Sequence, residues 1–185
     1  MKKNKIIIFD LDGVLINSLP NMKKSLYLTS KKLNKKLSFK KYKKYLGLPF
    51  EKILSKMGIK DNFKEIKKYY EFYSLKYINQ IKIKKKFLID LNDLKKKYFL
   101  AIFTSKSKKR TRKILSKYDL FDYIVTIDDV KDGKPKPEGI IKILKKFKIK
   151  RKNAVFIGDS IYDFQCAKNS RIKYLHANWG YEILD

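Results

Sequence analysis

The sequence has a single cysteine, Cys166, among its 185 residues. An intrachain disulfide is therefore excluded, and the chain fits a reducing compartment. Histidine is equally scarce, and we interpret the lone His176 as a surface or packing residue. No apolar run is long enough to span a membrane. The apolar run near the N-terminus is too short for a signal peptide, and Asp10 and Asp12 interrupt it. These absences predict a soluble, cytoplasmic protein without a membrane partner.

Acidic residues and arginine are also scarce beside lysine. The chain has 47 basic and 18 acidic residues, and its formal net charge is +29. So high a charge raises the question of a nucleic-acid or anionic-membrane partner. However, surfaces that read bases favour arginine, and the dispersed lysines are typical of a solvated surface. We therefore do not expect nucleic-acid binding to be the main function. The arginines are Arg110, Arg112, Arg151 and Arg171.

The most informative stretch is the apolar run Ile6–Phe9 and the turn that follows it. A continuous apolar run of this kind is typical of a strand buried on both faces in a parallel sheet. Residues i and i+2 of a strand point the same way, so we expect Asp10 and Asp12 to face one pocket. Two like charges this close are costly without a cation or a shared proton. A divalent ion with oxygen ligands would remove that cost.

A lysine-rich region with apolar residues at helical spacing extends from about Ser18 to Asn79. Gly47, Pro49 and Gly58 punctuate it, and no stretch of it has a convincing strand pattern. We predict an insertion of three or four helices here. Its tyrosines recur at helical spacing, and we interpret them as packing residues.

Strand and helix patterns alternate from Ile83 onwards, which is typical of a parallel sheet flanked by helices. We predict an α/β fold in which a Rossmann-like parallel sheet carries an inserted α-helical domain. The core is predicted to comprise residues 1–15 and 82–185, and the helical insertion residues 16–81. The predicted later strands are 98–103, 122–127, 154–157 and 172–175, and the predicted helices before and between them are 87–94, 109–118, 138–147 and 161–168.

Reactive side chains follow the predicted strands. Ligands of an open parallel sheet bind beyond the carboxyl ends of its strands, so we expect these side chains to lie near one another. The spacing of Asp159 and Asp163 can bring both carboxylates to the same side of a loop–helix junction. The positions in chain order are Asp10, Asp12, Thr104, Lys134, Asp159 and Asp163.

This ordered set resembles the motifs of the haloacid dehalogenase-like hydrolase superfamily over essentially the whole chain. The motifs are Asp10-Leu11-Asp12-Gly13, Thr104-Ser105, Lys134-Pro135-Lys136-Pro137 and Gly158-Asp159-Ser160 followed by Asp163. The resemblance implies a Mg²⁺-dependent phosphatase that hydrolyses a small phosphomonoester through an aspartyl-phosphate intermediate. It also implies that the helical insertion is a cap domain that closes over the site.

The resemblance implies a role for each catalytic side chain. Asp10 would be the nucleophile, and Asp12 the general acid and then the general base. Thr104 and the backbone amide of Ser105 would bind the phosphoryl oxygens. Lys134 would neutralise charge on the nucleophile and on the transferring group. A simple strand-end hydroxyl cap is the alternative role of Thr104.

A metal site is implied in the same way. Mg²⁺ would be held by Asp10, Asp159 and the backbone carbonyl of Asp12, and Asp163 would support the ion directly or through water. Lys136 competes with Lys134, but the family pattern Lys-Pro-x-Pro selects Lys134. We interpret three further acidic residues as loop and turn residues: Asp128, Asp129 and Asp132.

The branch of the superfamily decides which reaction is expected. Residues 47–51 and 102–107 resemble phosphoglycolate phosphatase-like members, so the substrate would be a small phosphorylated metabolite such as a phosphoglycolate-like, sugar or nucleotide phosphate. Val14 stands where many of these phosphatases carry threonine, which leaves open a sugar phosphomutase of the β-phosphoglucomutase type. A basic nucleic-acid-binding module without catalysis is a third, less favoured alternative. Relatives usually continue beyond the position of Asp185, so we expect a reduced core edge, and the oligomeric state is open between monomer and weak dimer.

Overall fold

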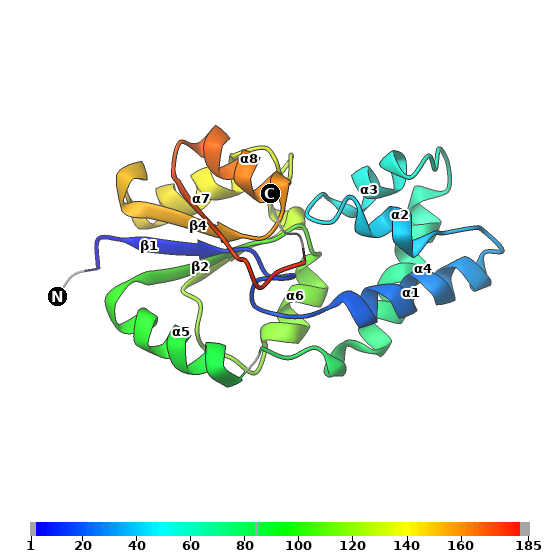
Figure 1. The fold of residues 1–185 in the computed structure, drawn as a ribbon, viewed down its shortest axis with the longest axis horizontal. Coiled ribbons are helices and arrows are strands. Elements are labelled where there is room, and N and C mark those ends of the chain that lie inside the picture. Colours follow the sequence, from blue (N-terminus) through cyan, green and yellow to red (C-terminus); the bar gives the residue numbers. More distant parts are fainter. Residues whose placement is uncertain (1–2, 84, 182–185) are drawn as a thin grey trace.

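The computed structural model describes residues 3–83 and 85–181, and a five-stranded sheet lies at the centre of this part of the chain (Figure 1). The strand order is β3-β2-β1-β4-β5, and all neighbouring strands are parallel. The prediction of an α/β fold with a parallel sheet is confirmed. The strands are β1 (Ile6–Phe9), β2 (Phe99–Phe103), β3 (Tyr123–Val125), β4 (Ala154–Gly158) and β5 (Lys173–His176).

Helices cover both faces of the sheet, and β1 contributes side chains to each face. Ile7 packs in a cluster with residues of α5 and α6, whereas Ile8 packs with residues of α7 and α8. Successive residues of a strand point to opposite faces, which explains why the run Ile6–Phe9 is apolar throughout. These helices are α5 (Lys85–Lys97), α6 (Lys108–Leu115), α7 (Glu138–Phe147) and α8 (Ile161–Ser170).

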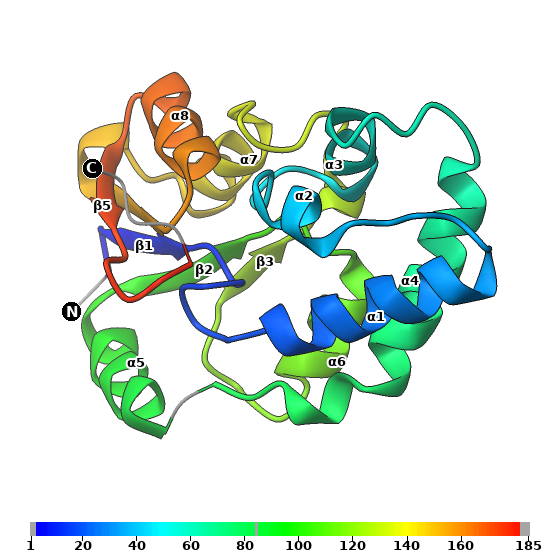
Figure 2. The same ribbon diagram turned by 45° about the vertical axis from the view of Figure 1, so that its right-hand side comes forward.

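The inserted region lies beyond one end of the sheet and is helical (Figures 1 and 2). It has its own apolar cluster, in which Leu26 of α1 and Ile66 of α4 are fully buried. Tyr42 and Tyr70 are buried in the same cluster, so the packing interpretation is confirmed for these two tyrosines. Within the described residues this region contains α1 (Leu19–Lys32), α2 (Phe39–Lys43), α3 (Phe50–Lys56), α4 (Phe63–Lys76) and the 3₁₀ turn η1 (Ile78–Gln80).

The two connections between the sheet and the inserted region lie side by side, because Ile16 and Ile83 form an antiparallel bridge. The exact limits 1–15, 16–81 and 82–185 stay predictions. Residues 1–2, 84 and 182–185 of these ranges lie outside the described part of the chain. Within that part, no helix is both long enough and apolar enough to cross a membrane.

Most predicted element limits agree with the structure, and the differences have local causes. The predicted helix 138–147 coincides with α7. The predicted strand 122–127 is reduced to β3, because Thr126 leaves the sheet to cap the 3₁₀ turn η2 (Ile127–Asp129). A further 3₁₀ turn, η3 (Arg151–Asn153), leads into β4.

The central strand yields a stability prediction. Ile8 is 0% exposed, so we expect Ile8→Ala to lower the free energy of unfolding by about 2–5 kcal/mol through lost burial and a residual cavity. The same substitution at Ile89, which is 60% exposed on α5, is the matched control and should change it by about 0.5 kcal/mol or less. Urea unfolding followed by circular dichroism measures both. Equal effects of the two substitutions would contradict the observed burial of β1.

Candidate active site

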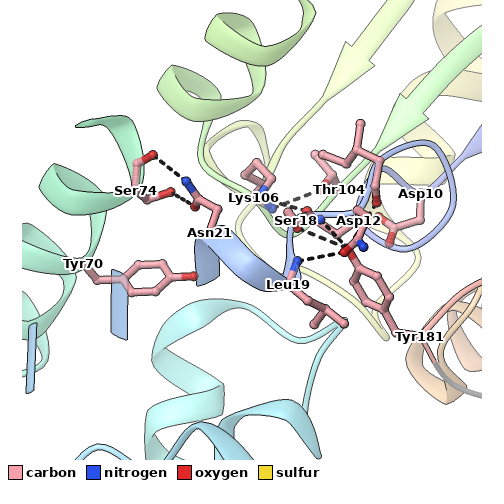
Figure 3. Close-up of polar contacts among 12 residues, drawn as sticks. Asp10, Asp12, Ser18, Leu19, Asn21, Tyr70, Ser74, Thr104, Lys106 and Tyr181 are labelled. Atoms are coloured by element: carbon pink, nitrogen blue, oxygen red, sulfur yellow. Dashed lines mark hydrogen bonds and ion pairs between the residues drawn. The ribbon is translucent and has the colours of Figure 1, made fainter. Parts of the chain in front are cut away.

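The carboxyl ends of β1, β2 and β4 meet at one cavity of about 200 Å³, which the inserted region covers from the other side. Asp10, Asp12, Thr104 and Asp159 line it from the sheet. The expectation that Asp10 and Asp12 face one pocket is therefore met. The loop between α2 and α3 lines the cavity opposite them. Figure 3 shows Asp10, Asp12 and Thr104 gathered at this edge of the sheet.

The turn after β1 requires glycine at position 13. Gly13 has a φ of +85°, in the left-handed region that disfavours other residues. A Cβ atom at this position would lie 2.0 Å from Oδ2 of Asp159. The Gly13 amide donates to the carbonyl of Ile16, which closes the turn at 2.9 Å. Glycine therefore lets the carboxylates that follow β1 and β4 approach each other.

Lys134 lies beneath the cavity and is 0% exposed. Its Nζ is 2.6 Å from Oδ1 of Asp10 and 2.7 Å from Oδ1 of Asp163. Burial alone would lower the pKa of Lys134, but the two carboxylates outweigh burial and raise its pKa above the ordinary value. The ammonium group therefore stays charged and holds both carboxylates in place. In this structure its contacts are with these aspartates, and its predicted contact with a phosphoryl group stays a prediction.

Asp163 also helps to cap the first turn of helix α8. Its Oδ2 accepts hydrogen bonds from the amide of Ser160 at 3.1 Å and from the Ser160 hydroxyl at 2.6 Å. The Ser160 hydroxyl in turn accepts a hydrogen bond from the Asp163 amide, so the two residues form a capping box. One carboxylate oxygen of Asp163 thus fixes the helix, and the other faces Lys134.

Three buried carboxylates lie close enough to share one cation. One oxygen each from Asp10, Asp159 and Asp163 falls within 4.8 Å of the others. Burial and the neighbouring carboxylates raise the pKa of Asp10 well above its ordinary value, although Lys134 opposes the shift. Burial raises the pKa of Asp159 to about 7. The three carboxylates repel one another, and a hard divalent ion such as Mg²⁺, which prefers oxygen ligands, would remove that repulsion.

Thr104 and Ser105 follow β2 directly. The Thr104 hydroxyl is buried and accepts a hydrogen bond from the amide of Lys106 at 3.2 Å, so it stabilises the local turn as well as lining the cavity. The Ser105 hydroxyl donates to the carbonyl of Gly47 at 2.6 Å. This bond joins the turn after β2 to the inserted region at the mouth of the site.

Asp12 has partners that sequence reasoning did not identify. Oδ1 of Asp12 is 3.0 Å from Nζ of Lys106, and it also accepts a hydrogen bond from the Ser18 hydroxyl (Figure 3). Lys106 is 4% exposed. Burial and the nearby Arg110 lower the pKa of Lys106 to about 8, against the opposing effect of Asp12. A lysine two places after a strand-end threonine was the available signal, but its pairing with Asp12 depends on the fold.

Residues near position 180 complete the site from the C-terminal side. The amide of Tyr181 donates to Oδ2 of Asp159 at 2.6 Å. The Tyr181 hydroxyl accepts from the amide of Ser18 at 2.5 Å and donates to the carbonyl of Ile16 at 3.1 Å. Trp179 donates from Nε1 to the carbonyl of Val14 at 2.9 Å. This segment therefore holds both Asp159 and the connection that leads into α1.

The acidic residues after β3 have structural roles in this loop. Oδ2 of Asp129 accepts hydrogen bonds from the amide and the hydroxyl of Thr126, and Oδ2 of Asp128 accepts one from the amide of Lys108. Their interpretation as loop residues agrees with these contacts.

Fold and site together define the class of this protein: an α/β protein with acidic residues at the ends of parallel strands and a helical insertion above them. The sequence matches the haloacid dehalogenase-like hydrolase family over residues 7–177. The chain belongs to that family.

Two similar proteins are named as a phosphoglycolate phosphatase and a pyrophosphatase. The chain is 32% identical over 194 residues to the phosphoglycolate phosphatase of Aquifex aeolicus, covering 98% of this chain and 88% of the relative. It is 30% identical over 186 residues to the pyrophosphatase PpaX of Bacillus mycoides, covering 96% of this chain and 85% of the relative. The different substrates named for these two relatives leave the substrate of this chain open.

Solved structures support the fold. A haloacid dehalogenase-like hydrolase from Streptococcus pneumoniae superimposes with a TM-score of 0.80 at 23% identity, covering 98% of this chain and 88% of the other. CbbY from Rhodobacter sphaeroides, solved with phosphate, gives a TM-score of 0.81 at 18% identity, covering 96% and 88% of the two chains. At these identities the likeness establishes the shared architecture.

The raised carboxyl pKa values predict a pH dependence of stability without metal. Between its unfolded pKa near 3.9 and its folded pKa of about 7, Asp159 binds more protons in the folded state. The free energy of unfolding in EDTA should therefore fall as pH rises from 5 to 7. We expect Asp159→Asn to reduce this slope and excess Mg²⁺ to offset the loss at pH 7. Thermal denaturation across this pH range tests the prediction, and a slope unchanged by Asp159→Asn would contradict it.

Proposed function

We propose that the protein is a Mg²⁺-dependent phosphatase that hydrolyses a small phosphomonoester through an aspartyl-phosphate on Asp10. The observation that carries the proposal is the position of Asp10, at the cavity floor between Lys134 and two further buried carboxylates. The shared family and the phosphatase relatives support the same reaction class. The substrate would be a small phosphorylated metabolite, because the cavity is compact.

The metal in this proposal would be held by Asp10, Asp159 and the backbone carbonyl of Asp12, with Asp163 as support. The proximity and burial of the three carboxylates support this assignment. When bound, Mg²⁺ would offset the negative charge of these carboxylates and of the phosphoryl group. Without a bound cation, a phosphate dianion would be repelled by the three aspartates that line the cavity.

Asp10 would attack phosphorus with one carboxylate oxygen, forming an O–P bond while the bond to the leaving oxygen breaks. Asp12 would donate a proton to that leaving oxygen and later take one from the water that hydrolyses the acyl phosphate. The contacts of Asp12 with Lys106 and Ser18 would fix its orientation for both transfers. Lys134 would hold Asp10 in position for attack from beneath the cavity.

Thr104 and the amide of Ser105 would hold the phosphoryl oxygens. Their placement directly after β2, at the cavity beside Asp10, supports this role. Backbone amides and hydroxyls fixed in advance stabilise developing negative charge without reorganisation.

Residues 16–81 would act as the cap of this enzyme. The region has its own apolar cluster and two adjacent connections to the core, which are the features of a body that moves about a hinge. The hydrogen bond between Ser105 and Gly47 then belongs to a closed arrangement in which the cap excludes water from the cavity.

The phosphomutase alternative was motivated by Val14, which is 1% exposed and packs in the core with Leu11 and Leu15. Val14 is not among the residues that line the cavity, so its side chain gives no direct support to either reaction. The relatives named as phosphatases make hydrolysis the preferred reaction. Formation of glucose 6-phosphate from β-glucose 1-phosphate without phosphate release would reverse this preference.

Substitution of the nucleophile tests the mechanism. We expect Asp10→Asn to lower Mg²⁺-dependent hydrolysis of p-nitrophenyl phosphate by about 10³-fold or more, because the amide cannot form the acyl phosphate. The matched control is Asp90→Asn on the surface of α5, which should keep the wild-type rate. Steady-state kinetics measures both variants. Full turnover by Asp10→Asn would exclude the aspartyl-phosphate mechanism.

The metal assignment has its own test. Asp159→Asn removes one negative charge from the proposed ligand set, so we expect the Mg²⁺ concentration for half-maximal activity to rise by about 10–100-fold. Activity is measured over a Mg²⁺ titration after dialysis against EDTA. An unchanged half-maximal concentration would remove Asp159 from the ligand set.

A further inference from the structure

A buried arginine of α6 has hydrogen-bond donors that the described residues leave unused. Arg110 is 6% exposed, yet its Nε and Nη2 atoms make no hydrogen bond within the described part of the chain. None of the ion pairs found there includes Arg110. A guanidinium group stays charged in proteins, and a buried charge without a partner is strongly unfavourable.

The surroundings of Arg110 compensate its charge only in part. The guanidinium lies over the ring of Tyr70 of α4, 5.1 Å from the ring centroid, which provides a cation–π contact. Lys106, one turn earlier in the chain, is a second buried cation, and Arg110 contributes to lowering its pKa. Asp12 pairs with Lys106. Of the two buried cations at this end of the site, Lys106 therefore has a carboxylate partner and Arg110 has none among the described residues.

Arg110 lines the same cavity as the proposed nucleophile Asp10 and the proposed acid Asp12. It also borders a neighbouring pocket, which acidic and lysine side chains line together. The proposed phosphoryl site lies in the catalytic cavity, so a substrate bound there would bring its remaining groups beside Arg110. Figure 3 shows Tyr70 on the side of the inserted helices and Asp12 with Lys106 on the side of the sheet.

We propose that Arg110 selects substrates whose leaving group carries a second anionic group, a carboxylate or a phosphate, and binds that group through its guanidinium. This inference rests on the proposed function, because it names the residue that binds the second anionic group of the same substrate. The planar guanidinium fork matches both kinds of anion with two parallel hydrogen bonds. The compact cavity limits the leaving group to a few atoms between the phosphoryl group and the second anion.

The assignment divides small phosphomonoesters into two sets. Esters with an anionic tail satisfy the buried guanidinium, whereas esters of neutral alcohols and sugars leave it without a charged partner. A site built around a buried donor discriminates strongly against analogues that lack its partner. Arg110 is thus a specificity residue contributed by the sheet domain rather than by the inserted helices.

The first test compares 2-phosphoglycolate and pyrophosphate, which carry a second anion, with 2-hydroxyethyl phosphate, which carries a neutral tail. We expect the wild-type kcat/KM to be at least about tenfold higher for one or both anionic substrates than for the neutral one. In Arg110→Gln, this ratio should fall by about tenfold or more, mainly through KM. The two anionic substrates distinguish a carboxylate from a phosphate as the second group.

Arg112→Gln is the matched control, because Arg112 is exposed on the same helix and should leave the ratio unchanged. Arg110→Lys keeps the charge but loses the fork, and it should give an intermediate ratio. If neither Arg110 variant folds, the wild-type ratio alone decides: a wild-type enzyme that hydrolyses neutral and anionic esters equally well overturns the proposal.

A binding experiment separates this inference from the proposed function. Calorimetry with Mg²⁺ present compares 3-phosphonopropionate with propylphosphonate, which have the same chain and differ in the carboxylate. Tighter binding of 3-phosphonopropionate that Arg110→Gln abolishes supports the role of Arg110 even if no ester is hydrolysed. Hydrolysis of phosphomonoesters without any such preference supports the phosphatase and overturns the role of Arg110.

Discussion

One buried lysine makes the arrangement of acidic residues in this protein possible. Lys134 has no exposed surface and lies within 2.7 Å of a carboxylate oxygen of both Asp10 and Asp163. Two carboxylates so close together and so deeply buried would otherwise repel each other and favour protonation. Because Asp10 follows β1 and Asp163 lies in the first turn of α8, the charge of Lys134 also fixes the relative positions of these two elements.

A lysine cannot fully neutralise the acidic residues around it, and this imbalance favours metal and substrate binding. Asp10, Asp159 and Asp163 share one small volume beneath the cavity, and the pKa of Asp159 is raised to about 7 by burial. At the opposite side of the cavity the imbalance has the other sign, because Lys106 pairs with Asp12 while Arg110 has no ion-pair partner among the described residues. A cavity with excess negative charge at one end and excess positive charge at the other suits a cation beside a doubly anionic molecule. The large positive charge of the whole surface would attract such a molecule from solution.

The site also depends on contacts between segments that are distant in sequence. Ser105 after β2 bonds to Gly47 of the inserted region, and Tyr181 bonds to Asp159 and to the connection that leads into α1. These bonds link the inserted helices, the sheet and the C-terminal segment at one place. Asp12 accepts a hydrogen bond from Ser18 in that connection. Movement of the inserted region would therefore change the position of Asp12 or break this bond.

The sequence by itself determined the parallel sheet, the helical insertion and the grouping of Asp10, Asp12, Thr104 and Asp159, because periodicity and strand-end position are local properties of the chain. Only the tertiary structure decided the partners. Tertiary packing determines that Lys106 pairs with Asp12 and that Lys134 is buried between Asp10 and Asp163. It also buries Arg110 without an ion-pair partner among the described residues. In so basic a sequence, the buried lysines and arginines cannot be distinguished from the exposed ones by their sequence context. The charge of such a residue acquires a specific role only when folding removes water from around it and decides which carboxylates remain within reach.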